Sequence, residues 1–154
     1  MRKAIEVRSA NPNSPDALAL LAAGHEAMHS LFSGKRIVDF SITALMADNV
    51  HLFLAYHEEA AVGCCAVSNE ADYSELKKLF VLPEARGLGV AASLICRAEE
   101  TARAAQSGKV MLESGAGLHA AHRLYLRLGY ERRGVFGLHE DLSTSLFFEK
   151  SLTR

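Results

Sequence analysis

Short apolar runs alternate along the chain with segments in which apolar residues recur every three or four positions. The runs predict strands, because turn residues bound them, and the longer spacing predicts helices that bury one face. The expected strands cover residues 5–8, 50–56, 60–67, 73–82, 109–113, 130–136 and 145–150, and the expected helices begin at Pro15, Leu88 and Gly117. This order of elements predicts a mixed α/β sandwich around one sheet.

The first expected helix has clear start signals. Ser14 suits the N-cap position and Pro15 the first helical position. Residues at helical spacing then continue the pattern as far as Phe32. Gly24 interrupts this pattern, so we expect either a weak point there or a break between two short helices.

The strand expected over residues 73–82 contains a slip in its alternation. Leu76 is followed by two lysines before the apolar positions resume at Leu79 and Val81. One extra residue in a strand is accommodated by a β-bulge, which bends the strand away from its neighbour. We therefore expect a bulge between Leu76 and Leu79, and an end to the strand at Pro83.

The turn after this strand, residues 86–91 (Arg-Gly-Leu-Gly-Val-Ala), carries two glycines and leads into a helix. Glycines let the backbone approach a ligand closely, and a helix start offers unpaired N–H groups and the positive end of its dipole. Such a turn can bind a pyrophosphate, with Arg86 adding positive charge. The alternative is a strand-to-helix turn in which glycine serves only the backbone geometry.

A dinucleotide-binding fingerprint is a second interpretation of the same turn. Gly87, Gly89 and Ala92 satisfy its spacing, and Glu113 ends the next strand about where a ribose-binding acid is expected. Residues 83–86 separate the strand from the first glycine, however, whereas that fold turns tightly, and too little chain follows for its second half. The Walker phosphate loop is excluded, because its Gly-Lys-Ser/Thr sequence does not follow.

Residues 25–29 (His-Glu-Ala-Met-His) match the helix motif of zinc proteases. Histidines four residues apart share a helical face, and the glutamate between them can activate a zinc-bound water. No later segment has a pattern that predicts a third zinc ligand. His25 also falls on the apolar stripe of the helix, where a histidine packed in the core is the commoner outcome. We therefore expect no metal site, and a zinc hydrolase stays as an alternative.

Length, charge and cysteine content narrow the functional classes. A chain of 154 residues, 49% of them apolar, suits one domain over residues 1–154. Its net charge of −1 gives no electrostatic case for binding nucleic acid or a membrane surface, and no apolar run is long enough to span a bilayer. Cys64 and Cys65 are expected on opposite faces of one strand, so we predict no disulfide framework and a cytoplasmic location.

Two segments together resemble the GNAT superfamily of acetyl-CoA-dependent N-acyltransferases. Residues 79–91 match its cofactor-binding signature at Arg86, Gly89 and Ala91, and residues 124–130 (Leu-Tyr-Leu-Arg-Leu-Gly-Tyr) match its second element. The resemblance implies a single GNAT-like α/β (α+β) domain, in which about four helices flank a mostly antiparallel sheet of about six to seven strands. It also implies acetyl-CoA as the acyl donor. The residues implied to hold this donor are Leu79, Phe80, Val81, Arg86, Gly87, Leu88, Gly89, Val90, Ala91 and Ala92.

The resemblance also implies how the reaction runs. The bulge is expected to leave a backbone N–H near Val81 free for the thioester carbonyl, and Tyr125 falls on the family's tyrosine, which donates a proton to the leaving thiolate. Glu75 and Glu113, expected on adjacent strands, are candidates to take the proton of the acceptor amine through water. The alternatives to these roles are a packed tyrosine and surface carboxylates. Leu118 departs from the family pattern, because many members carry there an asparagine that touches the cofactor.

The acceptor side of the site is less defined. In GNAT proteins the first helices border the acceptor, which implies Glu26, His29 and Phe32, and the loop over residues 136–141 with His139 is expected on the other side. The default acceptor is the primary amine of a small molecule or an amino acid. No nucleic-acid or membrane partner is expected, and homodimers are frequent in the family. A non-catalytic acyl-CoA sensor is the alternative function, although the tyrosine argues for an enzyme.

Overall fold

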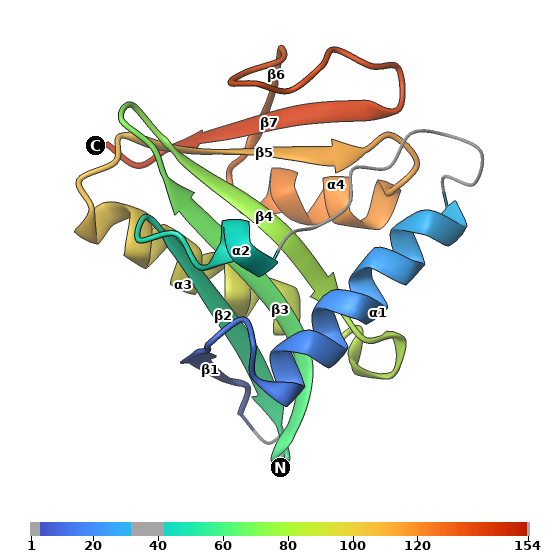
Figure 1. Cartoon of the computed structure of the whole chain (residues 1–154). Coiled ribbons are helices and arrows are strands. Elements are labelled where there is room, and N and C mark those ends of the chain that lie inside the picture. The colour runs from blue at the N-terminus through green and yellow to red at the C-terminus, as the bar shows by residue number, and fades with distance from the viewer. Residues whose placement is uncertain (1–3, 32–41, 154) are drawn as a thin grey trace.

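The computed structural model describes residues 4–31 and 42–153, which form a seven-stranded sheet with helices on both faces (Figure 1). The strands are β1 (Glu6–Ser9), β2 (Val50–His57), β3 (Ala60–Asn69), β4 (Ser74–Val81), β5 (Lys109–Gly115), β6 (Glu131–Arg133) and β7 (Ser145–Ser151). The helices are α1 (Pro15–Leu31), α2 (Ile42–Leu45), α3 (Val90–Ala104) and α4 (His119–Arg127), and a short 3-10 helix, η1 (Pro83–Ala85), precedes α3.

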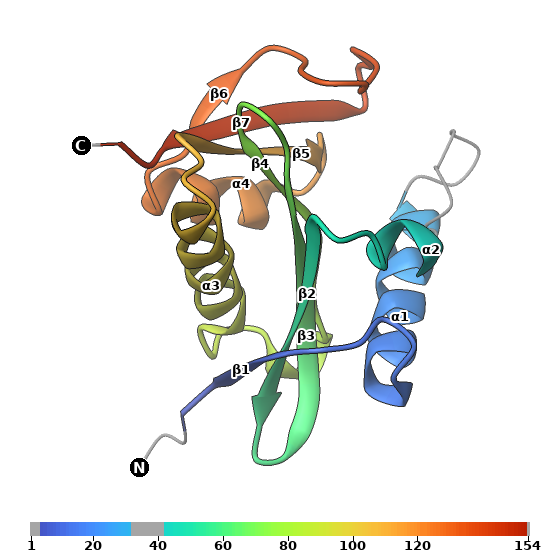
Figure 2. The same ribbon diagram turned by 60° about the vertical axis from the view of Figure 1, so that its left-hand side comes forward.

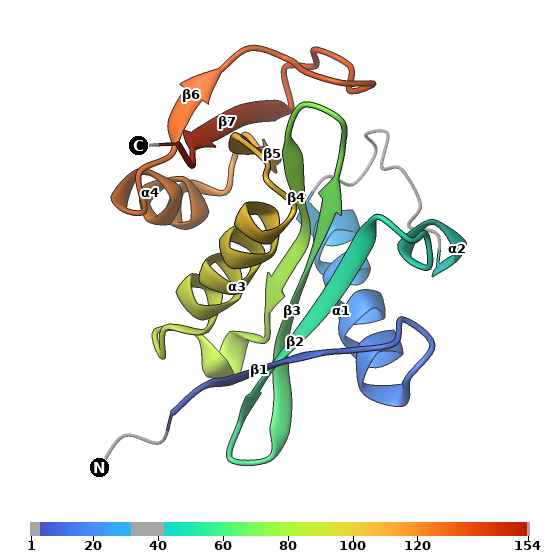
Figure 3. The ribbon, with the colours of Figure 1, turned by 90° about the vertical axis from the view of Figure 1, so that its left-hand side faces the viewer.

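The strands lie in the order β1-β2-β3-β4-β5-β7-β6. β4 and β5 are parallel, and every other neighbouring pair among the described strands is antiparallel. α1 and α2 cover one face of the sheet, and α3 and α4 cover the other (Figures 2 and 3). The predicted mixed sandwich with a mostly antiparallel sheet is therefore confirmed. This topology argues against the dinucleotide-binding alternative, since that fold is built on a mainly parallel sheet.

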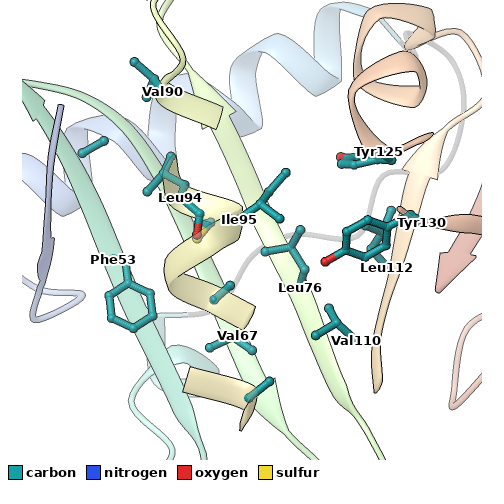
Figure 4. Close-up of a cluster of buried hydrophobic side chains, with 14 of the residues drawn as sticks. Phe53, Val67, Leu76, Val90, Leu94, Ile95, Val110, Leu112, Tyr125 and Tyr130 are labelled. Atoms are coloured by element: carbon teal, nitrogen blue, oxygen red, sulfur yellow. The ribbon is translucent and has the colours of Figure 1, made fainter. Parts of the chain in front are cut away.

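The larger apolar core lies between the sheet and α3 (Figure 4). Leu94 and Ile95 of α3 are almost completely buried there, together with Leu76 of β4. Burying one aliphatic side chain of this size contributes about 2 kcal/mol, so this contact is the main force that holds α3 on the sheet. Cys65 belongs to this core, whereas Cys64 belongs to the smaller core under α1 and α2, which confirms that these neighbours lie on opposite faces.

The start of α1 agrees with the sequence, and its middle does not. Ser14 accepts a hydrogen bond from the N–H of Ala17 at 3.4 Å, so the predicted N-cap is confirmed. α1 then runs without a break to Leu31, so of the two alternatives at Gly24 the break between two helices is wrong. A Cβ at Gly24 would lie 3.3 Å from the side chain of Phe80, so the glycine lets α1 pack closely against β4.

The second half of the strand expected over residues 130–136 is not a strand. β6 ends at Arg133, and residues 134–144 form what we call the β6–β7 loop. Phe136 turns towards the sheet and packs edge-on against Tyr73, with ring centroids 5.6 Å apart. The apolar residues of this segment therefore anchor a loop instead of continuing a strand. The sequence pattern also does not predict α2, which is about one turn long.

Candidate active site

β4 and β5 run side by side and then separate, which opens the sheet (Figure 1). Their paired residues end at Leu76 opposite Leu112. The pairing of β4 with β3 contains one extra β4 residue at Lys78, which has a φ of +58°. The predicted bulge is therefore confirmed. We call the opening between residues 77–81 of β4 and residues 113–115 of β5 the fork.

The bulge determines what β4 presents to the fork. Leu76, Leu79 and Val81 all contact the α3-side core, although an unbroken strand would place residues 76 and 79 on opposite faces. Leu82 donates its backbone N–H to the carbonyl oxygen of Val62 at 2.9 Å. Alternate residues of an antiparallel strand direct their N–H groups to the partner, so the N–H of Val81 points away from β3 and into the fork.

The turn that follows η1 exposes a row of backbone amides. Gly87 and Gly89 both have a φ of +83°, which favours glycine, and a Cβ on either would meet no atom within 4 Å. The N–H of Ser93 donates to the carbonyl oxygen of Gly89 at 3.1 Å. Gly89 is the N-cap residue of α3, so the N–H groups of residues 90–92 belong to its first turn, where a helix has no partners of its own for them. With the Arg86 guanidinium at their side, these amides form an anion site at the positive end of α3.

Tyr125 of α4 lies on the α3 side of the sheet, against β5 and β7. Its side chain is 5% exposed, and its ring centroid is 5.4 Å from that of Phe148 and 6.0 Å from that of Tyr130. Figure 4 shows the rings of Tyr125 and Tyr130 beside the core under α3. Burial raises the pKa of Tyr125 to about 12, and a hydrogen bond with Ser114 lowers it in part. Ser114 belongs to the fork end of β5, and its Oγ lies 3.2 Å from Nε2 of His122. The phenol is therefore protonated at neutral pH, as a proton donor must be, and the sequence does not predict Ser114 or His122 beside it.

On the other face of the sheet, the β6–β7 loop brings His139 between two carboxylates. Its Nε2 lies 2.7 Å from Oε2 of Glu75 on β4, and its Nδ1 lies 3.3 Å from Oε1 of Glu113 on β5. Hydrogen bonds with Glu113 and then Glu75 raise the pKa of His139 to about 9, and the same contact holds the pKa of Glu113 below its usual value. The sequence predicts Glu75 and Glu113 on adjacent strands and His139 separately, and the structure joins all three in what we call the Glu75–His139–Glu113 cluster.

The remaining sequence candidates are not gathered at this cluster. Glu26 and His29 are exposed on α1, and Phe32 lies outside the described residues. Leu118 precedes α4 and provides no side-chain cap for it. Across residues 4–31 and 42–153, no group of three or more His, Cys, Asp or Glu side chains is arranged so that it could hold a metal ion. Nor is any helix in these two ranges long and apolar enough to cross a membrane.

Comparisons with known proteins agree with this geometry. Residues 48–132, more than half of the chain, match the acetyltransferase (GNAT) domain family. An Azospirillum brasilense protein named IAA acetyltransferase is 34% identical over 113 residues, which cover 72% of this chain and 74% of that protein. The aminoalkylphosphonate N-acetyltransferase of Salmonella typhimurium is 34% identical over 94 residues, which cover 57% of this chain and 61% of that protein.

Solved structures share the fold across nearly the whole chain. A Klebsiella pneumoniae protein provisionally assigned as an acyl-CoA N-acyltransferase matches with a TM-score of 0.81 at 26% identity, over 97% of this chain and 98% of that one. The paiA N-acetyltransferase of Thermoplasma acidophilum, solved in complex with coenzyme A, matches with a TM-score of 0.71 at 15% identity, over 96% and 99%. The second likeness concerns the fold alone. Because the domain family covers more than half of its length and the A. brasilense relative most of it, the chain belongs to the GNAT family of acetyltransferases and is an acyltransferase enzyme.

Proposed function

We propose that this chain binds acetyl-CoA and transfers the acetyl group directly to the primary amine of a small molecule or an amino acid. The observation that carries the proposal is the fork between β4 and β5. The Val81 N–H points into it from one strand, and Ser114 with Tyr125 borders it at the other. From the β4 side of the fork, the chain leads directly through η1 to the amides of residues 87–92. A donor with phosphates at one end and a thioester at the other fits this order of groups.

The proposed donor contacts follow from this order. The N–H groups of residues 87–92 hold the pyrophosphate, and Arg86, whose Nε donates to the carbonyl oxygen of Val81 at 3.4 Å, adds positive charge beside them. Residues 79–81 pair with the pantetheine arm, because this side of β4 has no β5 partner beyond Leu76. The Thermoplasma acidophilum neighbour, which contains coenzyme A, has the same fold and so supports this choice of donor.

The proposed reaction divides its proton transfers between the two faces of the sheet. Acetyl-CoA, when bound, supplies the thioester, and the Val81 N–H donates to its oxygen as negative charge develops there. The acceptor ammonium first gives one proton to Glu75 through water. The neutral nitrogen then forms the N–C bond while the C–S bond breaks. Tyr125 protonates the leaving sulfur, and the second proton that the nitrogen sheds restores the phenol, so each turnover releases one proton.

The acceptor is proposed to reach the fork from the α1 side. Glu75 and Glu113 stand there, and carboxylates attract an ammonium group. Glu26, His29 and Phe32 stay predictions for the outer part of this side. A relative named for aminoalkylphosphonates supports a small amine as the acceptor class.

The test is a screen for thiol release from acetyl-CoA over classes of amine, with Tyr125→Phe as the test variant. Removing the phenol proton is expected to lower kcat about 100-fold and to leave the Kd of coenzyme A within about twofold. Tyr56→Phe is the matched control, since the Tyr56 hydroxyl donates to Asp16 at the start of α1, away from the fork. Full turnover by Tyr125→Phe would remove the acid role. Binding of coenzyme A without release by any amine would favour the acyl-CoA sensor.

A further inference from the structure

The β6–β7 loop is fastened to the sheet in two separate ways. Phe136 packs against Tyr73 and Phe147, with ring centroids 5.6 and 5.8 Å away. The His139 ring meets that of Phe136 edge-on, with centroids 4.9 Å apart, and directs its two nitrogens at carboxylates from two different strands. The aromatic contacts already anchor the loop, so the polar contacts of His139 need a separate explanation.

His139 carries a positive charge in this arrangement. A neutral imidazole has one N–H and can donate to only one of the two carboxylates, whereas the imidazolium donates to both. Its nitrogens lie 2.7 Å from Glu75 and 3.3 Å from Glu113, which is the geometry of a doubly donating ring. The pKa of about 9 that the two carboxylates produce agrees with this state.

Apart from His139, the groups near Glu75 contribute little positive charge to balance its carboxylate. Nζ of Lys77 lies 4.0 Å from its Oε1, at the limit of an ion pair, while Ser145 hydrogen-bonds Glu113 instead. Tyr73, two residues before Glu75, brings no positive charge, and Arg133 pairs with Glu149 at 3.2 Å instead. Glu75 is 7% exposed, and burying a charged carboxylate is costly unless it is paired and hydrogen-bonded. His139 is the cation in direct hydrogen-bonding contact.

The cluster also sits where β4 and β5 part. Pairing between these strands ends at Leu76 and Leu112, and Glu75 and Glu113 each adjoin one of these residues. His139 therefore bridges the two strands at the base of the fork. Any group that shifts His139 also changes the position and charge of both carboxylates.

We propose that His139 is a positioning residue for acetyl transfer, which holds Glu75 and Glu113 across the fork and places a positive charge beside the Glu75 carboxylate that accepts the proton of the amine. This inference rests on the proposed function, where Glu75 has that role. Oε2 of Glu75 is occupied by His139, which leaves Oε1 for the water that brings the proton. His139 itself takes no proton from the amine, because both of its nitrogens already carry one.

The test compares the pH dependence of kcat/KM in His139→Gln and His139→Arg, using acetyl-CoA and a primary amine that the wild type accepts. His139→Gln can hydrogen-bond but has no charge, so the acid limb moves up by about one pH unit. The loss is then up to about tenfold larger on the acid side of the limb than on the plateau at high pH. His139→Arg restores the charge and keeps the wild-type limb. His51→Gln, at an exposed position on β2, leaves the profile unchanged.

The possible outcomes distinguish a positioning role of His139 from two alternatives, a residue that only anchors the loop and a general base. A loss in His139→Gln that is equal at every pH means that His139 only anchors the loop, and overturns the proposal. Loss of the limb in both variants makes His139 the base itself, which also overturns it. A nitrogen-15 NMR titration of the His139 ring gives a readout without turnover: both ring nitrogens are expected to stay protonated through neutral pH, and a neutral ring at pH 7 overturns the proposal. Absence of turnover in the wild type with every amine counts against the proposed function instead.

Discussion

Replacing Gly89 with aspartate tests whether the turn before α3 binds the phosphates of coenzyme A. Gly89 directly precedes α3 and has a φ of +83°. Asparagine and aspartate tolerate a positive φ better than other side chains, and a Cβ here meets no atom within 4 Å. Gly89→Asn and Gly89→Asp therefore share their backbone strain and their size, and they differ by one negative charge.

The expected effect of that charge follows from its distance to the ligand. An aspartate at the start of α3 would lie about 4 Å from a phosphate held by the amides of residues 87–92, and two unit charges at that distance repel by about 4 kcal/mol at an effective dielectric constant of about 20. Screening by about 0.15 M salt reduces this energy to roughly 2–3 kcal/mol. The Kd of coenzyme A is then roughly 30- to 150-fold higher for Gly89→Asp than for Gly89→Asn.

Isothermal titration calorimetry with coenzyme A measures this difference directly. Titrations at low, physiological and high sodium chloride add a second readout, because the gap between the two variants narrows as salt screens the repulsion. Equal Kd values for Gly89→Asp and Gly89→Asn would refute the assignment of the phosphates to this turn. A gap that does not depend on salt would show that the aspartate acts through the backbone and not through its charge.

Three further predictions concern stability. Lys150→Met removes the ammonium 2.9 Å from the buried Glu99, so urea unfolding should show a loss of about 2–3 kcal/mol, most of which returns when Glu99→Gln is added. Gly24→Leu overpacks the contact of α1 with β4 and should cost about 1–3 kcal/mol in the same assay, whereas Ala22→Leu, at an exposed position, changes the free energy of unfolding by less than about 0.5 kcal/mol. His139 has a pKa of about 9 in the folded chain and about 6.5 in the unfolded chain. Its protonated ring therefore stabilises the fold fully below pH 6.5, and this stabilisation is lost as the pH rises to about 9. Allowing for its 26% exposure, this loss is about 2 kcal/mol, and thermal unfolding against pH should show it in the wild type and not in His139→Gln.

Each of these predictions has a contradicting result. Unchanged stability of Lys150→Met would mean that Glu99 is solvated, and no recovery in the double variant would mean that the lysine stem provides the stability. Equal effects of Gly24→Leu and Ala22→Leu would remove the close-packing reason for the glycine. Parallel pH curves for the wild type and His139→Gln would mean that the imidazolium contributes nothing to stability.

Local signals explain what the sequence predicts of the fold. The N-cap at Ser14 and the bulge after Leu76 are confirmed because each depends on a few neighbouring residues, namely a capping hydroxyl and a slip in alternation. Gly24 is misjudged because its reason is tertiary, since Phe80 approaches it from β4. The prediction of a strand through residue 136 is wrong for the same kind of reason. Phe136 packs against the ring of Tyr73, a contact distant in the sequence, and so does not continue the alternating pattern of a strand.

Within the candidate site, the sequence likewise predicts the part that depends on neighbouring residues and does not predict the part that depends on tertiary contacts. The amides of residues 87–92 follow from a glycine-bearing turn before a helix, which is a local pattern. The contact of His139 with Glu75 and Glu113 joins a loop to two strands, and no spacing of residues along the chain predicts this contact. The cluster becomes visible only when the topology places β4 beside β5 and returns the β6–β7 loop across both strands.

The most direct test of acetyl transfer follows the acetyl group itself. The chain is incubated with acetyl-CoA that carries a carbon-13 acetyl group and with amino acids, aminoalkylphosphonates and other primary amines, and the products are measured by mass spectrometry. We predict that a labelled N-acetyl product and free coenzyme A form one to one, at a rate about 100-fold lower in Tyr125→Phe. Tight binding of coenzyme A with the label retained on the thioester, whatever the amine, would contradict the proposed transfer.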